Sequence, residues 1–347
     1  MSSKNPAITP YARNWHTLSK RALNGGRVSR DDALIILASP DDDILSILDA
    51  AFVLRRHYFG YGVRLHVIQN ARRGACSEDC AFCGQSNKAA NTAENHSLLS
   101  ADAILEGARA AYRMKAIRNC IVTSGRQPSP HDIETICDAA HKIKAELPIA
   151  LCVSLGLLTP EYAGRLKEAG IDRYNHNLET SENYFPNICT THSYADRIAT
   201  VQTAKKAGLE LCSGGLIGLG ETPSDRVDLA FALRELKLDS IPLNFFDPRP
   251  DTKLERNLKP TTIDCLKTLA MFRFVNPSTE IRAAGGREAC LGNLQVLALF
   301  AANSIFTNGY LTTSGQGYDA DIAMIKSAGF HVAEIDHSWK GIHNEKN

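Results

Sequence analysis

The sequence predicts an α/β fold, namely a (β/α)8 barrel of the TIM type with an N-terminal helical extension. From about residue 62 onward, short runs of β-branched and apolar residues alternate with longer segments of helical periodicity, which is typical of parallel strands joined by helices. The alternating region, residues 62–335, has about the length of an eight-unit barrel, which is typically ~250 residues. An open doubly wound sheet is the second possibility.

Eight segments have the composition of strands, and helical segments separate them. The expected strands are 63–69, 118–124, 149–155, 171–176, 209–216, 240–246, 280–284 and 303–307. The expected helices are 100–115, 130–146, 159–169, 193–207, 223–237, 261–275 and 289–301. Several of these helices begin at a residue that can cap a helix N-terminus, such as Ser100, Thr159 and Thr261.

A short repeated sequence marks where helices lead into strands. Residues 167–171, 205–209 and 326–330 each read Lys, any residue, Ala, Gly and then an apolar residue. A basic residue suits the last turn of a helix, and Gly suits the left-handed position that ends it. The repeat therefore predicts joints between a helix and the next strand of a repeated unit.

Composition and charge exclude several classes of protein. With 347 residues, 44% of them hydrophobic, the chain can bury a large core, which excludes disordered and fibrous folds. The net charge of +1 argues against nucleic acid or an anionic membrane as partner. We expect a cytoplasmic protein, because no membrane span or signal peptide is recognisable. Residues 1–61 are expected to form a helical cap on the barrel, and residues 336–347 a tail.

Three cysteines lie in the loop after the first expected strand. Cys76, Cys80 and Cys83 have the spacing CxxxCxxC, and soft thiolates select zinc, copper(I) or iron–sulfur clusters. A closed structural zinc site requires a fourth protein ligand at similarly short spacing, and no such ligand follows in the sequence. A [4Fe–4S] cluster with three cysteines would leave one iron open to a small molecule. Structural zinc and three free thiols remain the alternatives.

Three further cysteines fall within expected strands. Cys120, Cys152 and Cys212 would converge if their side chains point into the barrel, although a single buried cysteine is usually only a small apolar residue. Arg282 occupies the middle of the seventh expected strand, and a buried guanidinium is costly unless an anion meets it. These four residues predict a second, deeper metal cluster, with Arg118 as a further inward-facing cation.

The motifs resemble a known family. CxxxCxxC with an aromatic residue, Phe82, before the last cysteine resembles the radical S-adenosylmethionine (SAM) enzymes. Segments 174–181, 212–222, 286–288, 302–306 and 311–313, together with the inner cysteines, are similar to the biotin synthase family. The resemblance implies conversion of dethiobiotin to biotin. It implies that a SAM-binding [4Fe–4S] cluster generates a 5′-deoxyadenosyl radical and that an auxiliary [2Fe–2S] cluster donates the sulfur.

The resemblance also implies roles for single residues. Cys76, Cys80 and Cys83 would hold the first cluster, and the second would be held by Cys120, Cys152, Cys212 and Arg282. SAM would be bound by Phe82, Glu179, Gly214 and Gly215, the glycines leaving room for it. Dethiobiotin would be bound by Asn175, Asn177, Asn244, Thr312 and Thr313. A low-potential electron donor such as flavodoxin or ferredoxin and a homodimer are further implications.

Some alternatives stay open at this level. A hydrogenase-maturation protein or another radical SAM barrel enzyme is the nearest rival, and a zinc-stabilised binding module is a rival of a different class. Arg282 is either an iron ligand or a counter-ion. Cys189 and Cys290 fall near strand-end loops and leave the nuclearity of the second cluster open. Cys137 and Cys265 lie in expected outer helices and are interpreted as structural.

Overall fold

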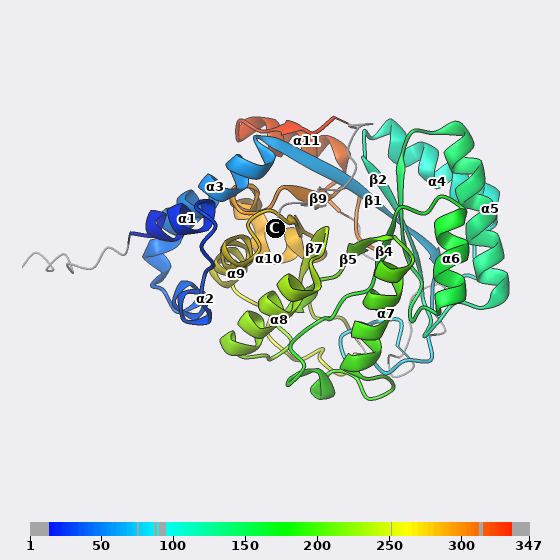
Figure 1. Cartoon of the computed structure of the whole chain (residues 1–347), viewed down its shortest axis with the longest axis horizontal. Coiled ribbons are helices and arrows are strands. Elements are labelled where there is room, and N and C mark those ends of the chain that lie inside the picture. Colours follow the sequence, from blue (N-terminus) through cyan, green and yellow to red (C-terminus); the bar gives the residue numbers. More distant parts are fainter. Residues whose placement is uncertain are drawn as a thin grey trace, which may run out of the picture.

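A closed barrel of parallel strands forms the centre of the molecule (Figure 1). The computed structural model describes residues 14–74, 76–86, 89, 95–250, 252–311 and 315–334. Within these residues the last barrel strand, β9 (Ser304–Phe306), pairs with both β8 (Glu280–Ala283) and β1 (Gly62–Arg72). This pairing closes the sheet, so the predicted (β/α)8 fold class is confirmed and the open sheet is excluded.

The other strands follow the expected segments closely. They are β2 (Arg118–Thr123), β3 (Ala150–Ser154), β4 (Arg173–Asn175), β5 (Glu210–Cys212), β6 (Gly215–Ile217) and β7 (Ser240–Phe245). A further short strand, β10 (His331–Val332), was not among the expected segments. β5 and β6 together take one place in the barrel, because both pair with β7. β10 pairs with the start of β1, outside the closed ring.

Helices cover the outside of the barrel (Figure 1). They are α4 (Ala101–Arg113), α5 (Pro130–Glu146), α6 (Pro160–Glu168), η2 (Phe185–Asn187), α7 (Tyr194–Lys206), α8 (Pro223–Leu236), α9 (Thr262–Val275), α10 (Arg287–Leu291), η3 (Gly292–Phe300) and α11 (Tyr318–Ser327). The side chains of Ser100, Thr159 and Thr261 each accept a hydrogen bond from the backbone N–H three residues on, as predicted. The repeated glycines at 170, 208 and 329 have φ of 94°, 74° and 77°, which confirms the predicted joints.

The N-terminal segment forms helices that pack on one side of the barrel. α1 (His16–Leu23), α2 (Arg30–Leu37), η1 (Asp41–Asp43) and α3 (Ile44–Phe59) precede β1. α2 and α3 pack against α9, whose residues are therefore buried on its outer face as well as its inner face. Arg55 of α3 is fully buried and donates to the carbonyl of Gly62 at 2.7 Å, where the barrel begins. The expected tail at 336–347 lies outside the described residues.

Two expected elements differ from the structure. The expected strand 209–216 is interrupted between β5 and β6, where a Cβ on Gly214 would lie 1.8 Å from the carbonyl oxygen of Pro242. The expected helix 289–301 is a short α-helix followed by a 3-10 helix, because Gly292 has a φ of 49° and ends α10. Both breaks depend on close contacts or backbone angles that apolar periodicity does not reveal.

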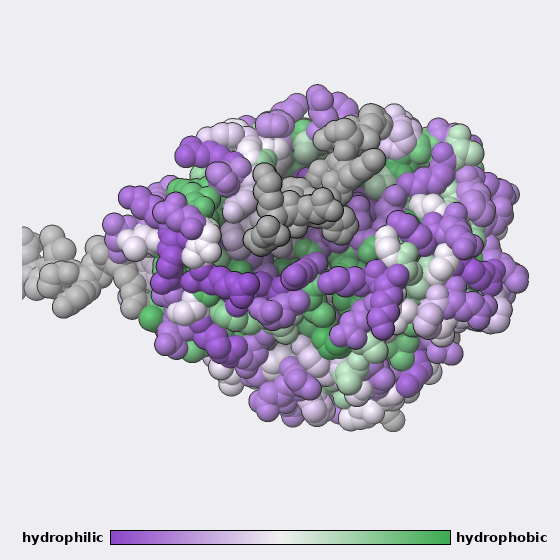
Figure 2. Space-filling model, viewed as in Figure 1, coloured by the Kyte–Doolittle hydropathy of each residue, from purple (hydrophilic) through white to green (hydrophobic). Residues whose placement is uncertain are grey.

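None of the described helices is long and apolar enough to span a bilayer. Figure 2 shows a face that is mostly hydrophilic, with hydrophobic residues in small separate groups. Scattered groups of this kind are ordinary on protein surfaces.

A buried carboxylate organises the floor of the barrel. Glu280 of β8 accepts hydrogen bonds from Arg282 at 2.5 Å, Ser240 at 2.9 Å and Ser304 at 3.2 Å on one oxygen. Its other oxygen accepts from Arg64 at 3.1 Å. Glu280, Arg282, Ser240 and Ser304 are all buried, so these bonds are made in an environment where an unpaired charge would be very costly.

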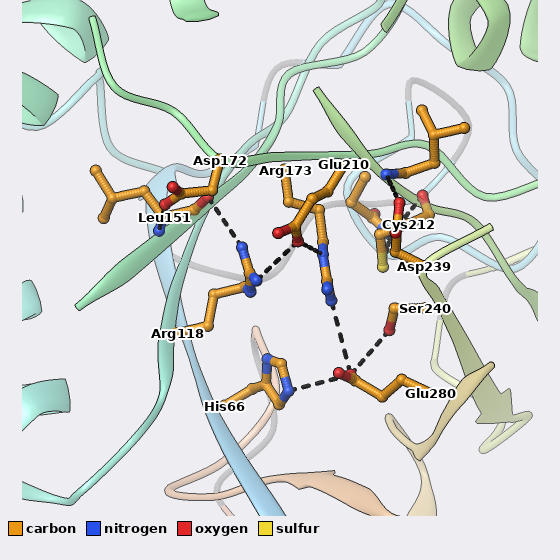
Figure 3. A network of polar contacts seen from close by, with 12 residues as sticks. His66, Arg118, Leu151, Asp172, Arg173, Glu210, Cys212, Asp239, Ser240 and Glu280 are labelled. Carbon is orange, nitrogen blue, oxygen red and sulfur yellow. Dashed lines mark hydrogen bonds and ion pairs between the residues drawn. The ribbon is translucent and has the colours of Figure 1, made fainter. Parts of the chain in front are cut away.

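A second carboxylate lies beside the first (Figure 3). Glu210 of β5 accepts from Arg118 at 2.9 Å and from Arg173 at 2.8 Å, and Arg173 also lies 3.7 Å from Glu280. The network therefore joins β1, β2, β4, β5, β7, β8 and β9 by side chains inside the barrel. Among the groups joined by these ion pairs the cations outnumber the anions: the guanidinium groups belong to Arg64, Arg118, Arg173 and Arg282, and the carboxylates to Glu210 and Glu280. Asp172 and Asp239, also drawn in Figure 3, instead accept hydrogen bonds from the backbone N–H groups of Leu151 and Leu211.

The remaining ionisable member of the floor is neutral. His66 of β1 is fully buried, with Nε2 3.2 Å from Glu280 and 3.2 Å from Arg282. Burial, reinforced by the positive charge of Arg282, lowers the pKa of His66 to about 3. The floor therefore keeps its excess of positive charge at neutral pH.

Removing the charge of Glu280 should destabilise the barrel. We expect Glu280→Gln to lower the free energy of unfolding of the cluster-free protein by about 3–5 kcal/mol, because it leaves buried guanidinium groups without their partner. The exposed Glu235 provides the control, since Glu235→Gln should change stability by less than ~0.5 kcal/mol. Denaturant unfolding measures both, and equal stabilities of the two variants would contradict the role given to Glu280.

His66 should also make stability depend on pH. Its pKa rises from about 3 in the folded state to 6.5 on unfolding, so the unfolded chain binds the extra proton between these values. Stability is fully present above about pH 6.5 and falls toward pH 3, by about 1.4 kcal/mol per pH unit for each such histidine. Burial also lowers the pKa of His176, so His66→Gln should remove about half of the slope between pH 6 and 5. An unchanged slope in denaturant titrations would show that His66 is not buried in its neutral form.

Candidate active site

A cavity of about 620 Å³ opens inside the barrel and at the loops that follow its strands. Its lining includes residues of the loop after β1, of the strand interiors and of the segment after β9: Phe82, Cys83, Cys120, Asn177, Arg282 and Tyr310. The volume is in the range of small-molecule binding sites. Its position at the carboxyl ends of the strands is where barrel enzymes carry their active sites.

The three-cysteine loop turns back on itself directly after β1. The backbone N–H of Gly74 donates to the side chain of Gln85 at 3.0 Å, and the N–H of Cys83 donates to the carbonyl of Cys80 at 3.1 Å. Burial raises the pKa of the Cys83 thiol to about 11, and the nearby Cys76 adds to this effect. The loop therefore brings its thiols together beside the cavity, as a shared metal centre requires.

The inner cysteines occupy β2, β3 and β5 of the barrel, the first two of which are adjacent. β2 and β3 pair so that Cys120 lies opposite Cys152, and Cys212 ends β5. All three thiols are buried. Cys152 hydrogen bonds to Cys120, which lowers the pKa of Cys120 and raises that of Cys152, while burial raises the pKa of Cys212. The predicted convergence of these strand cysteines is thus present in the structure.

Arg282 lies between the inner cysteines and the barrel floor. Its Nη1 is 4.0 Å from the Cys212 sulfur, and its guanidinium lies over the ring of Phe306 at 4.8 Å. Among the described residues, its buried Nε has no hydrogen-bond partner. An unpaired buried donor beside three thiols, above a floor with excess positive charge, fits an anionic group bound at this place.

Three amide side chains of the cavity lining are held in fixed orientations. Asn175 donates to the oxygen of Asn177 at 3.3 Å and to the sulfur of Cys212 at 3.2 Å. Asn244 accepts from the N–H of Gly285 at 2.9 Å and donates to the carbonyl of Gly215 at 3.3 Å. The expected binding residues Asn175, Asn177 and Asn244 therefore share one cavity. Thr312 and Thr313 lie outside the described residues.

Glu179 and the two glycines lie at one side of the same cavity. Glu179 lines the cavity in a left-handed conformation, with φ of 70°, and its carboxylate is 3.6 Å from Arg197. Burial raises its pKa, and Arg197 opposes this effect. The expectation that Gly214 and Gly215 leave room for SAM needs correction. A Cβ on Gly215 would meet Leu229 at 2.5 Å and the Glu179 carbonyl at 2.6 Å. These glycines allow close packing of protein atoms, and neither is among the described residues that line the cavity.

The other cysteines separate from the inner set. The sulfur of Cys189 lies 3.9 Å from that of Cys80, so it belongs to the outer loop. Cys290 is close to Cys265 and hydrogen bonds to the carbonyl of Phe246 at 3.4 Å. Cys137 is half-buried on α5. The inner set within the described residues therefore consists of the three strand cysteines.

Several residues of the site were not found by sequence reasoning. Arg118 faces inward, as predicted, but its partner Glu210 and the paired Arg173 were missed, as was His66. The sequence contained a signal only for Glu280. It precedes Arg282 by two residues, so its side chain lies on the same face of the strand and could have been predicted to point into the barrel. The partners of Arg118 and His66 come from other strands and left no local pattern.

Two family models match the chain. The Radical SAM superfamily matches residues 73–233, and the Biotin and Thiamin Synthesis associated domain matches residues 242–331. The first begins at the end of β1, just before the three-cysteine loop, and the second begins within β7.

Relatives match along nearly the whole chain. The biotin synthase of Salinibacter ruber is 51% identical over 322 residues, which cover 93% of this chain and 90% of that protein. The biotin synthase of Lysinibacillus sphaericus is 47% identical over 92% of this chain and 96% of that protein. The biotin synthase of Bacillus subtilis is 45% identical over 93% and 96%, respectively.

Solved structures show how widely the fold is shared. Methylornithine synthase superimposes with a TM-score of 0.80 at 19% identity, covering 92% of this chain and 98% of that one. The FeFe-hydrogenase maturase of Carboxydothermus hydrogenoformans superimposes with a TM-score of 0.77 at 17% identity, covering 91% and 78%. These likenesses establish the fold alone, so the rival reading as a hydrogenase-maturation protein is not favoured. The biotin synthases named above are about half identical to this chain over nine-tenths of its length and of their own. This chain therefore belongs to the biotin synthase family of radical SAM enzymes.

Proposed function

We propose that one cavity holds both metal centres of a sulfur-inserting enzyme that converts dethiobiotin to biotin with SAM. Membership of the family supports the reaction. The structural observation that carries the proposal is a cavity lined by Cys83 of the three-cysteine loop and by the three strand cysteines Cys120, Cys152 and Cys212 beneath it. Two sets at different depths allow substrate to lie between a radical source and a sulfur source.

The two sets of ligands differ in their protein environment. We assign a [4Fe–4S] cluster to Cys76, Cys80 and Cys83 because three thiolates leave one iron free for SAM. We assign an auxiliary cluster, of the [2Fe–2S] type, to the inner cysteines, with Arg282 beside it. When bound, the first cluster would supply one electron to the sulfonium of SAM, and the second would supply sulfur.

Arg282 acts in this proposal through its charge and its N–H groups. Its Nη2 is already held by Glu280 at 2.5 Å and Ser240 at 3.0 Å, which fixes the guanidinium beneath the thiols. A guanidinium remains protonated in proteins and then has no lone pair to donate. We therefore favour the counter-ion over the iron ligand, with the unpartnered Nε directed to the bound group.

The amides orient the substrate. Asn175 and Asn177 present both donors and acceptors to the cavity, which suits the flat ureido ring of dethiobiotin. Because Asn175 also contacts the Cys212 sulfur, a ring held by these amides would lie against the inner set. Glu179 would accept hydrogen bonds from the ribose hydroxyls of SAM, and Phe82 would pack on its adenine. Phe306 and Tyr310 form an apolar wall that excludes water from reactive carbon atoms.

The cellular setting completes the proposal. All ten cysteines are unbridged, which suits a reducing compartment such as the cytoplasm. We propose a flavodoxin or ferredoxin as electron donor and a homodimer as the assembly, both on the basis of the family. The helices α1, α2 and α3 would form the described part of the helical extension expected at residues 1–61.

Loss of an inner cysteine should separate the two half-reactions. We expect Cys152→Ala to lower biotin formation by more than ~100-fold, while SAM cleavage stays measurable. Loss of a group that only supports a metal ligand already lowers activity by up to ~100-fold, and loss of a ligand should cost more. Mass spectrometry of biotin and 5′-deoxyadenosine from anaerobic, reconstituted protein measures both. Cys137→Ala on the outer helix α5 is the control and should leave both products near wild-type levels. Wild-type biotin yields from Cys152→Ala would refute the assignment of the sulfur source.

Loss of an outer cysteine should abolish both half-reactions. We expect Cys80→Ala to form neither 5′-deoxyadenosine nor biotin, since the cluster would lose one of its three thiolates. The matched control is Cys290→Ala, whose thiol packs near Cys265. If Cys80→Ala still cleaves SAM at the wild-type rate under a low-potential reductant, the outer loop is not the SAM-binding centre.

A further inference from the structure

A cysteine and a histidine from another loop approach Cys80. The sulfur of Cys189 lies 3.9 Å from that of Cys80, and His192 presents Nδ1 and Nε2 to Cys189 at 3.3 and 3.8 Å. One ligand atom from each residue lies within 4.8 Å of the others. Cys189 and His192 come from the segment between η2 and α7, and neither has a part in the proposed reaction.

Hydrogen bonds between the two loops hold this arrangement. The carboxylate of Asp79 accepts from the backbone N–H groups of Thr190 at 2.9 Å and Thr191 at 3.3 Å. In the opposite direction, the N–H of Ala81 donates to the carbonyl of Ile188 at 2.8 Å. The approach of Cys189 to Cys80 is therefore built into the backbone and does not depend on the contact between the thiols.

The distances fit two ligands on one ion. For tetrahedral Zn²⁺ with Zn–S of ~2.3 Å and Zn–N of ~2.0 Å, two sulfurs lie ~3.8 Å apart, and a sulfur and a nitrogen ~3.6 Å apart. The observed distances are 3.9 Å between the sulfurs and 3.8 Å from the Cys189 sulfur to His192 Nε2. In an iron–sulfur cubane, each cysteine instead binds an iron of its own.

The histidine is also oriented as a metal ligand. His192 Nδ1 hydrogen bonds to the carboxylate of Glu78, which in turn accepts from the Thr191 hydroxyl at 2.7 Å. A carboxylate that accepts the Nδ1 proton leaves the lone pair of Nε2 free for a metal and fixes the direction of the ring. Glu78 is buried, so this orientation is protected from solvent.

We propose that Cys80, Cys189 and His192 form a mononuclear site for a tetrahedral divalent ion, Zn²⁺ above all, in protein that lacks the outer iron–sulfur cluster. The fourth position would be taken by water. Because Cys80 cannot serve both centres, the mononuclear ion and the [4Fe–4S] cluster exclude each other. That exclusion rests on the proposed function, whereas binding of the ion does not.

Cobalt titration of the cluster-free full-length chain tests the proposal. Co²⁺ replaces Zn²⁺ as a coloured probe, and we expect one tight equivalent with the absorption of tetrahedral thiolate coordination. Cys189→Ser should weaken this equivalent by more than ~100-fold, and Glu78→Gln by about 10–100-fold, as for loss of an outer-shell partner.

Cys76→Ala is the decisive control, because it removes a proposed cluster ligand and leaves the mononuclear site intact. We expect it to keep the tight equivalent. Loss of that equivalent in Cys76→Ala, or its full retention in Cys189→Ser, would assign the ion to the CxxxCxxC loop and overturn the proposal. Either result would leave the cluster assignment standing, so the two failures are distinguishable.

A measurement without variants gives a second test. X-ray absorption of the wild-type chain loaded with one equivalent of Zn²⁺ should show two sulfur ligands at ~2.3 Å together with nitrogen or oxygen at ~2.0–2.1 Å. A coordination shell of three or four sulfurs would contradict the proposed ligand set. This test remains decisive even if a variant at Cys189 does not fold.

Discussion

The buried carboxylate of Glu280 is the interaction on which the interior of this barrel depends. Barrel interiors are usually filled with branched aliphatic side chains, but here the lowest layer consists of ion pairs (Figure 3). Ion pairs at this depth cost several kcal/mol of desolvation for each charge, which only close and complete pairing offsets. Glu280 supplies that pairing to groups from several strands, and it thereby fixes the place of Arg282.

The charges of the floor also suit the anionic cluster that we propose at the thiols above it. Its guanidinium groups outnumber its carboxylates, and His66 stays neutral because of burial and the charge of Arg282. A surplus of buried positive charge destabilises the protein when it is unpaired, and it stabilises a negatively charged ligand bound next to it. In the proposed function, the stability of the cluster-free barrel and its affinity for the auxiliary cluster would therefore be linked through the same side chains.

The two sets of cysteines differ in how the backbone holds them. The inner cysteines lie on paired strands, where neighbouring residues are fixed by the hydrogen bonds of the sheet. The outer cysteines lie on a loop, which can adapt to a ligand and admit a small molecule. Methylornithine synthase and the hydrogenase maturase share the barrel fold at below 20% identity, so the fold by itself does not specify a function.

Local patterns in the sequence determined the alternation of strands and helices, the helix caps at Ser100, Thr159 and Thr261, and the existence of two thiol sets, whereas the pairing of β9 with β1 decided for the closed barrel over the open sheet. These features depend on periodicity and short spacing, which the chain carries within a few residues. The tertiary structure alone decided that Cys189 lies beside Cys80, 109 positions away, and that Glu210 and Glu280 neutralise arginines from other strands. Such pairings form only when strand register and loop packing bring distant segments together, and no local pattern encodes the distance between two side chains in a closed barrel.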